Sequence, residues 1–143
     1  MGTRVSFKFK RLLEERRLTR IKLDRQLVLK EIEGAKSDLE TARKSLHDEN
    51  FKWAIIQGYY SIFHSARALV YSKGFREKSH YALLVAIQEL FRDELESFLI
   101  QGFGDAMNLR QTADYGLTFS KEGAINVIDT AEKFLLKTKK ILR

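Results

Sequence analysis

The amino-acid sequence predicts an all-α fold, an up-and-down antiparallel bundle of four to five helices. Three observations support this prediction. The chain contains no proline, a residue that breaks helix interiors. Its apolar residues recur with helical spacing over long stretches, and no segment shows a convincing strand pattern. The stretches are separated by short connections, which make successive helices antiparallel neighbours.

The first long helix carries an apolar seam and is expected to end near residues 48–50. The spacings along the seam alternate between four and three residues, at Val28, Ile32, Ala35, Leu39, Ala42 and Leu46. This pattern is typical of a helix that packs lengthwise against another helix. The seam also leaves room for a dimer interface, and we expect a homodimer.

The second helix is expected over residues 51–72, with Asn50 as its N-cap and Gly74 just beyond its end. It is apolar around most of its circumference, which predicts a central, buried helix. Gly58 in its interior favours a close approach by another helix. One polar stripe interrupts the apolar surface, at Tyr60, His64, Arg67 and Tyr71.

Four further helical segments are expected. Ser79 is a suitable cap for a helix over about residues 80–91. Helical periodicity continues over residues 95–103 until Gly102 and Gly104, which are expected to loosen or end that helix. Residues 105–115 form another helical piece, stopped by Gly116. Ser120 caps the last helix, whose inward residues are Ala124, Val127, Ile128, Ala131, Phe134, Leu135, Thr138 and Ile141.

Net charge is concentrated at the N-terminal end. Residues 1–30 contain ten Lys/Arg and three Asp/Glu, whereas the remainder contains sixteen of each. We expect a basic N-terminal extension, residues 1–24, followed by a helical domain, residues 25–143, which is the part of the chain that resembles a known family. The extension resembles a tail up to about Arg20. It is either a site for RNA or another polyanion or a solvated arm, and charge alone favours the solvated arm.

Composition excludes several classes of site. The chain contains no cysteine and three histidines, so it offers no thiol nucleophile, and neither a metal site nor a cofactor is expected. No apolar run reaches the roughly 20 residues of a membrane span. The N-terminus lacks the apolar core of a secretory signal. A cytoplasmic location without membrane association is expected.

Three motifs resemble the HEPN family of small helical domains, and the resemblance covers about residues 25–143. They are Tyr59-Tyr60-Ser-Ile-Phe63-His64-Ser-Ala66-Arg67-Ala68-Leu69, then Gly74 with Lys78-Ser79-His80, and Arg110-Gln-Thr-Ala113-Asp114-Tyr115. The resemblance is to the subgroup often encoded beside a minimal nucleotidyltransferase. It implies a toxin–antitoxin-type module in which this chain is the partner of such an enzyme and binds nucleotide or RNA.

Many members of this family are metal-independent ribonucleases, and the resemblance implies this as the alternative function. Their site combines an Arg with a His four to six residues later, duplicated across a homodimer. Arg110 is present here, but no histidine follows it. The resemblance therefore points to Arg110 as a catalytic residue, and we take His64, or else His80, from another helix as the source of the imidazole.

The ligand-binding candidates are Tyr60, His64, Arg67, Asp114 and Tyr115. Each has a structural alternative. Arg67 and Asp114 could face a ligand or form a buried ion pair that locks two helices together. His64 could be catalytic or a hydrogen-bonded core histidine. Tyr60, with its neighbour Tyr59, could stack on bases or pack in the core with its hydroxyl satisfied.

Overall fold

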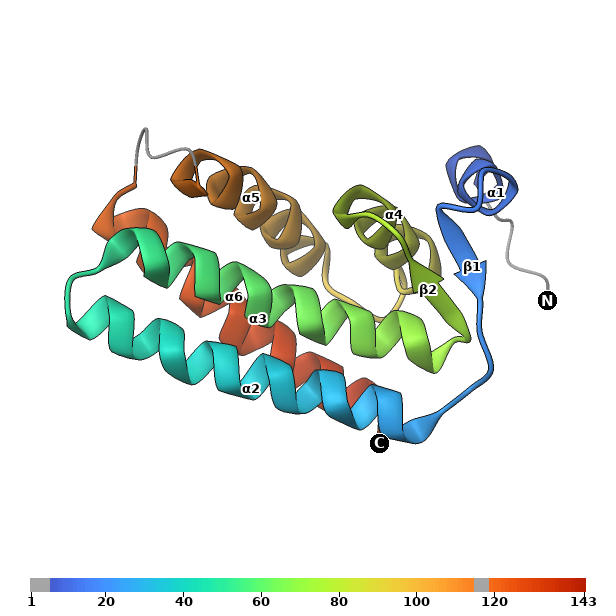
Figure 1. Cartoon of the computed structure of the whole chain (residues 1–143), viewed down its shortest axis with the longest axis horizontal. Helices are drawn as coiled ribbons and strands as arrows, with labels where there is room; N and C mark the ends of the chain where they lie inside the picture. Colours follow the sequence, from blue (N-terminus) through green and yellow to red (C-terminus); the bar gives the residue numbers. More distant parts are fainter. Residues whose placement is uncertain (1–5, 115–118) are drawn as a thin grey trace.

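Figure 1 shows the computed structural model of the chain, which describes residues 6–114 and 119–143. The predicted all-α fold is confirmed. Helices and one short pair of strands follow each other in the order α1 (Phe7–Glu14), β1 (Leu18–Arg20), α2 (Arg25–His47), α3 (Phe51–Ser72), β2 (Phe75–Glu77), α4 (His80–Leu90), α5 (Ser97–Asp114) and α6 (Lys121–Ile141).

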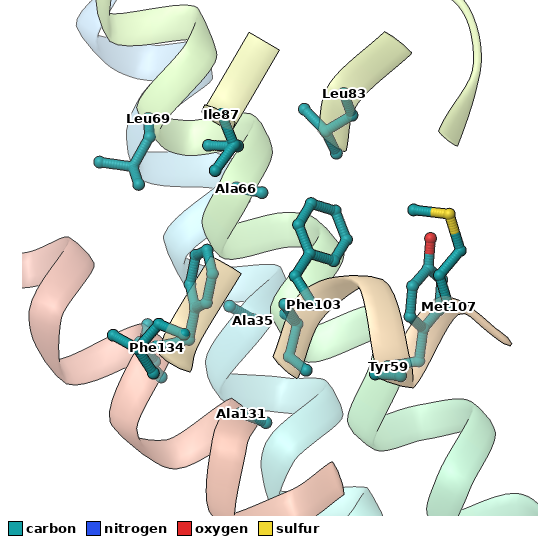
Figure 2. Packing of buried hydrophobic residues seen from close by; sticks show 14 of the residues in the cluster. Ala35, Tyr59, Ala66, Leu69, Leu83, Ile87, Phe103, Met107, Ala131 and Phe134 are labelled. Atoms are coloured by element: carbon teal, nitrogen blue, oxygen red, sulfur yellow. The ribbon is translucent and has the colours of Figure 1, made fainter. Parts of the chain in front are cut away.

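Helix α3 is the centre of the molecule, as its apolar circumference predicts. It packs against α2, α4, α5 and α6. Its side chains at Ala66 and Leu69 are fully buried, and Figure 2 shows them among residues of α2, α4, α5 and α6. Burial of this apolar surface is the main favourable contribution to folding.

The predicted helix boundaries agree with the local capping signals. The Ser79 and Ser120 hydroxyls accept hydrogen bonds from the backbone N–H groups of Ala82 and Gly123, in the first turns of α4 and α6. Gly74 follows α3 with φ of +83°, a left-handed conformation that favours glycine. Asn50 occupies the N-cap position of α3, but its side chain makes no capping hydrogen bond.

The predicted interruption near Gly102 and Gly104 is wrong, because α5 runs through both glycines from Ser97 to Asp114. A Cβ atom at Gly102 would lie 2.7 Å from Cγ2 of Thr130 on α6. The glycine is therefore explained by close helix packing. Gly58 on α3 has the same explanation, since its Cβ would lie 2.9 Å from Cγ1 of Val127, and this confirms the close approach expected there.

The N-terminal segment differs from the tail that the sequence predicts. From Ser6 onward it is folded, with Phe9, Leu12 and Leu18 buried. Helix α1 packs against α4, and β1 pairs antiparallel with β2, a short ribbon that periodicity did not reveal. Figure 1 shows α1 and β1 beside α4 and β2, at the end of the bundle where α3 ends. The boundary between residues 24 and 25 stays a prediction, although α2 begins at Arg25.

Candidate functional site

The polar stripe of α3 faces two carboxylates on α2 at the position of His64. Nδ1 of His64 lies 2.8 Å from Oε1 of Glu31, and Nε2 lies 3.4 Å from Oδ2 of Asp38. Burial raises the pKa of Asp38, and the nearby His64 opposes this effect. Gly34 on α2 leaves room for the ring, because a Cβ atom at this position would lie only 3.3 Å from the imidazole. His64 is thus held tightly against α2.

Arg67, one turn further along α3, carries a positive charge that two carboxylates compensate. Its Nε lies 3.1 Å from Oε2 of Glu77 on β2, and Nη1 lies 3.6 Å from Oε1 of Glu31. Arg67 also donates a hydrogen bond to the Tyr71 hydroxyl. Burial raises the pKa of Glu77, and the Arg67 charge works in the opposite direction. The ion pairs of Arg67 therefore connect α3 to α2 and to β2.

A second cluster lies on another side of α3, where α4 and α5 meet it. We call this the His80–Arg110 cluster; its residues are His80, Arg110, Tyr59, Tyr60 and Phe63. The Tyr59 hydroxyl shares a hydrogen bond with Nδ1 of His80, and the two rings are stacked with centroids 5.7 Å apart. Cζ of Arg110 lies 5.3 Å from the Tyr59 ring and 6.0 Å from the Tyr60 ring. The cluster thus brings an imidazole and a guanidinium to the same tyrosine.

The surroundings of the cluster favour the neutral forms of His80 and Tyr59. Burial lowers the pKa of His80, and the positive charges of Arg110 and Arg67 lower it further. Burial also raises the pKa of the Tyr59 phenol well above its usual value. At neutral pH the imidazole is uncharged. In the tautomer protonated at Nδ1, that N–H donates to the Tyr59 hydroxyl, and Nε2 is left to accept a proton.

The predicted site residues fall into two adjoining groups that meet at Phe63, whose ring lies 5.4 Å from Cζ of Arg67 and 5.8 Å from the His64 ring. His64 and Arg67 contact carboxylates, whereas Tyr60 lies with Arg110 in the His80–Arg110 cluster. His80 shares Tyr59 with Arg110, while the ion pairs of His64 are made with α2. The catalytic assignment of Arg110 with His64 stays a prediction. The side chain of Asp114 and all of Tyr115 fall outside the described residues, so the Arg67–Asp114 contact stays a prediction as well.

Sequence reasoning missed the carboxylates that surround the stripe, namely Glu31, Asp38 and Glu77. Glu31 and Asp38 are seven residues apart and flank the apolar seam of α2, so the heptad spacing could have placed both against α3. Glu77 gave no such signal, because it lies on β2, which the sequence did not predict.

The described part of the chain contains neither a metal-binding cluster nor a membrane-spanning helix. Over residues 6–114 and 119–143, no group of three or more His, Cys, Asp or Glu side chains is arranged to hold a metal ion. In the same part of the chain, no helix has the length and apolar character needed to cross a membrane.

Comparisons with known proteins agree with the fold. Residues 28–142 match the model of the HEPN domain family. Two proteins of Methanocaldococcus jannaschii, each named as a candidate toxin, align with this chain over 115 residues, which is 78% of its length. The first is 35% identical and is covered over 78% of its own length. The second is 31% identical and is covered over 86% of its own length. A UPF0332 protein of Archaeoglobus fulgidus is 30% identical over 118 residues, covering 76% of this chain and 89% of its own length. The crystal structure of a Thermus thermophilus protein superposes with a TM-score of 0.68 at 16% identity, covering 79% of this chain and 96% of that one.

Proposed function

Because this chain belongs to the HEPN domain family, we propose that it acts in a toxin–antitoxin-type module as the partner of a minimal nucleotidyltransferase and binds nucleotide or RNA. The names of the two Methanocaldococcus relatives support a toxin-type role. The motif resemblance to the subgroup encoded beside nucleotidyltransferases supports the choice of partner.

One observation favours a partner role over an independent nuclease. The basic side chains of the polar stripe are already paired with carboxylates of the same chain. His64 lies between two carboxylates, and Arg67 between Glu31 and Glu77. Negative charges so close to both groups oppose the approach of a phosphate. No histidine follows Arg110 to supply the usual imidazole. The aromatic ring of Tyr60, with Arg110 above it, is the better place for a base and its phosphate.

Co-expression tests the partner proposal. The chain is expressed with a tag beside a minimal nucleotidyltransferase from the same genome, and the complex is isolated at increasing salt. We expect the two chains to co-elute in a fixed ratio that persists at high salt. A tagged, unrelated basic protein controls for association by charge alone, which salt would abolish. If no complex forms at any salt concentration, the partner proposal fails.

The His80–Arg110 cluster favours a second candidate function, a metal-independent ribonuclease with a non-standard site. Nε2 of a neutral His80 could take the proton of a ribose 2′-hydroxyl, whose oxygen then attacks phosphorus and expels the 5′-oxygen of the next nucleotide. Arg110 would stabilise the negative charge that develops on the phosphate oxygens. The protonated His80 would return that proton to the leaving 5′-oxygen, so the products would be a 2′,3′-cyclic phosphate and a free 5′-hydroxyl.

RNA cleavage in EDTA tests this second candidate with four proteins: wild type, Arg110→Ala, His80→Gln and His64→Gln. A ribonuclease using the cluster loses activity in the first two variants and retains it in His64→Gln. Loss in His64→Gln with retention in His80→Gln would instead support the pairing of Arg110 with His64. Activity that survives Arg110→Ala contradicts the pairing of Arg110 with either histidine. An inactive wild type contradicts the ribonuclease candidate and favours the partner role.

A further inference from the structure

A basic hollow lies between the N-terminal segment and α4, outside the His80–Arg110 cluster. It has a volume of about 430 Å³, and Phe7, Lys8, Arg11, Glu15, Arg17 and Tyr81 contribute to its lining. We call it the α1–α4 hollow. Most of these residues precede residue 28, where the match to the family model begins. The hollow is therefore a feature of this chain beyond the matched domain.

The charge of the hollow is positive and accessible. Residues 6–25 contain eight Lys/Arg and three Asp/Glu. Arg11 and Arg17 both lie near Glu15, at 2.9 and 4.0 Å, but their side chains remain 65% and 46% exposed. Such exposed ion pairs contribute little energy, so the carboxylate is readily exchanged for a phosphate. Lys8, which is also exposed, adds a third cation to the same hollow.

Two exposed aromatic rings stand among these cations. Phe7 is 75% exposed and Tyr81 is 46% exposed. Cζ of Arg17 lies 5.9 Å from the centroid of the Tyr81 ring. Exposed rings interleaved with cations are the combination that binds single-stranded nucleic acid, because the rings stack on bases and the cations contact the phosphates between them.

We propose that the α1–α4 hollow binds single-stranded RNA, with bases stacked on Phe7 and Tyr81 and phosphates held by Lys8, Arg11 and Arg17. The position of the hollow supports RNA, because Tyr81 directly follows His80 in the chain and Arg17 Nη2 donates to the hydroxyl of Ser79 at 3.5 Å. A strand bound there lies next to the His80–Arg110 cluster. The inference deepens the proposed function by naming its ligand, but its observations come from a different surface.

Fluorescence anisotropy with a labelled oligouridylate of about ten nucleotides tests the proposal on the full chain. The charge variant is Lys8→Ser/Arg11→Ser. Its matched control is Lys139→Ser/Lys140→Ser, which removes the same charge from the exposed last turn of α6. We expect the hollow variant to bind at least about tenfold more weakly at about 0.1 M salt, and the control to change about twofold or less. Three phosphate contacts predict a slope of log affinity against log salt of about −2.

The aromatic residues distinguish RNA from other polyanions. Phe7→Ala and Tyr81→Ala are each expected to weaken binding about 5- to 100-fold, whereas Phe7→Tyr should bind like the wild type. Phe98→Ala on α5 is the control, since Phe98 is 55% exposed and does not line the hollow. Binding that is insensitive to both rings, or equal competition by heparin or by anionic lipid vesicles, would show a general polyanion surface and overturn the proposal.

The outcome can be separated from that of the partner proposal. The hollow variants are also tested for co-elution with the nucleotidyltransferase. Loss of RNA binding with the complex intact supports the hollow as an RNA site. RNA binding that depends on the hollow while no complex forms supports the hollow and overturns only the partner. A wild-type chain that does not bind the oligonucleotide overturns the inference, whatever the complex does.

Discussion

Arg67 brings a full positive charge to a position where its side chain is only 20% exposed. Removing a charge from water costs several kcal/mol unless a partner compensates it. Glu77 and Glu31, whose side chains are 6% and 12% exposed, provide that compensation. The three residues form a unit in which each makes the burial of the others possible, and loss of one leaves a buried charge behind.

Arg67→Met is therefore expected to lower the free energy of unfolding by about 2–4 kcal/mol, measured by urea denaturation. Arg43→Met is the control, because it breaks the ion pair with Glu132, in which both side chains are about half exposed, and should cost less than about 1 kcal/mol. Arg67→Met/Glu77→Gln should regain part of the loss, since the uncompensated carboxylate is gone. Equal costs for the two single variants would contradict this account.

A second residue-scale prediction concerns pH and His80. Burial, Arg110 and Arg67 hold the pKa of His80 below its ordinary value of 6.5. At a pH between the pKa of His80 in the folded chain and its pKa in the unfolded chain, the unfolded chain binds a proton that the folded chain does not. The contribution of His80 to stability therefore falls as the pH drops below 6.5, and it levels off below the folded-state pKa. Arg110→Ala should raise the pKa of His80, measured by NMR titration of its ring protons. Arg43→Met should not, and a pKa unchanged in both variants would exclude Arg110 as a cause.

At the scale of the element, the sequence predicts well what local signals determine. The bounds of α3 follow from its periodicity between Asn50 and Gly74, and the start of α6 follows from Ser120. Long-range packing determines the features that were missed. Gly102 interrupts the pattern of α5 because α6 lies against it, and β1 and β2 are three-residue strands whose partners are far apart in the sequence.

The candidate site also combines features that local sequence determines with features that depend on long-range packing. Spacing alone places Tyr60, His64 and Arg67 along α3, because a helix presents residues three and four apart on one side. The approach of His80 and Arg110 to Tyr59 depends on how α4 and α5 pack on α3, which no local pattern encodes. The sequence therefore could name the residues that carry chemistry, but not which of them share a cluster.

Two glycines in α5 give a matched test of helix packing. Gly102→Ala should destabilise the protein by about 1–3 kcal/mol, because its Cβ would lie 2.7 Å from Cγ2 of Thr130. Gly104→Ala should stabilise it by about 0.5–1 kcal/mol, because its Cβ would meet Leu84 at an ordinary 3.8 Å and alanine favours the helix. Unfolding in urea measures both. The double variant Gly102→Ala/Thr130→Ala should recover the loss, and stabilisation by Gly102→Ala itself would contradict the packing argument.

At the scale of the whole molecule, the N-terminal segment is part of the fold. The Phe9 ring packs edge-on against Phe75 of β2 with centroids 5.5 Å apart, and Leu12 and Leu18 are buried. The cations Lys8 and Arg11 remain outside, on the same helix α1 that buries Phe9 and Leu12. One short segment thus covers α4 and presents a basic surface.

Phe9→Ala should lower the free energy of unfolding by about 2–4 kcal/mol. The loss should be local, so amide hydrogen exchange should quicken in α1, β2 and α4 more than in α2 and α6. The exposed neighbour Phe7 provides the control, since it is 75% exposed and Phe7→Ala should change stability by less than about 0.5 kcal/mol. Uniform acceleration of exchange across all helices would contradict a locally docked segment.

The β1–β2 pairing also has a consequence for the order in which the protein folds. The register places Arg20 of β1 opposite Phe75 of β2, and the α2–α3 hairpin is the segment of chain that connects these two residues. Pairing the strands first would close a long, unordered loop, whereas zipping the hairpin brings the same ends together through local contacts. We therefore expect the ribbon and α1 to form late in folding. During synthesis the basic segment emerges before β2 and α4, and we expect it to remain unattached until both have been made.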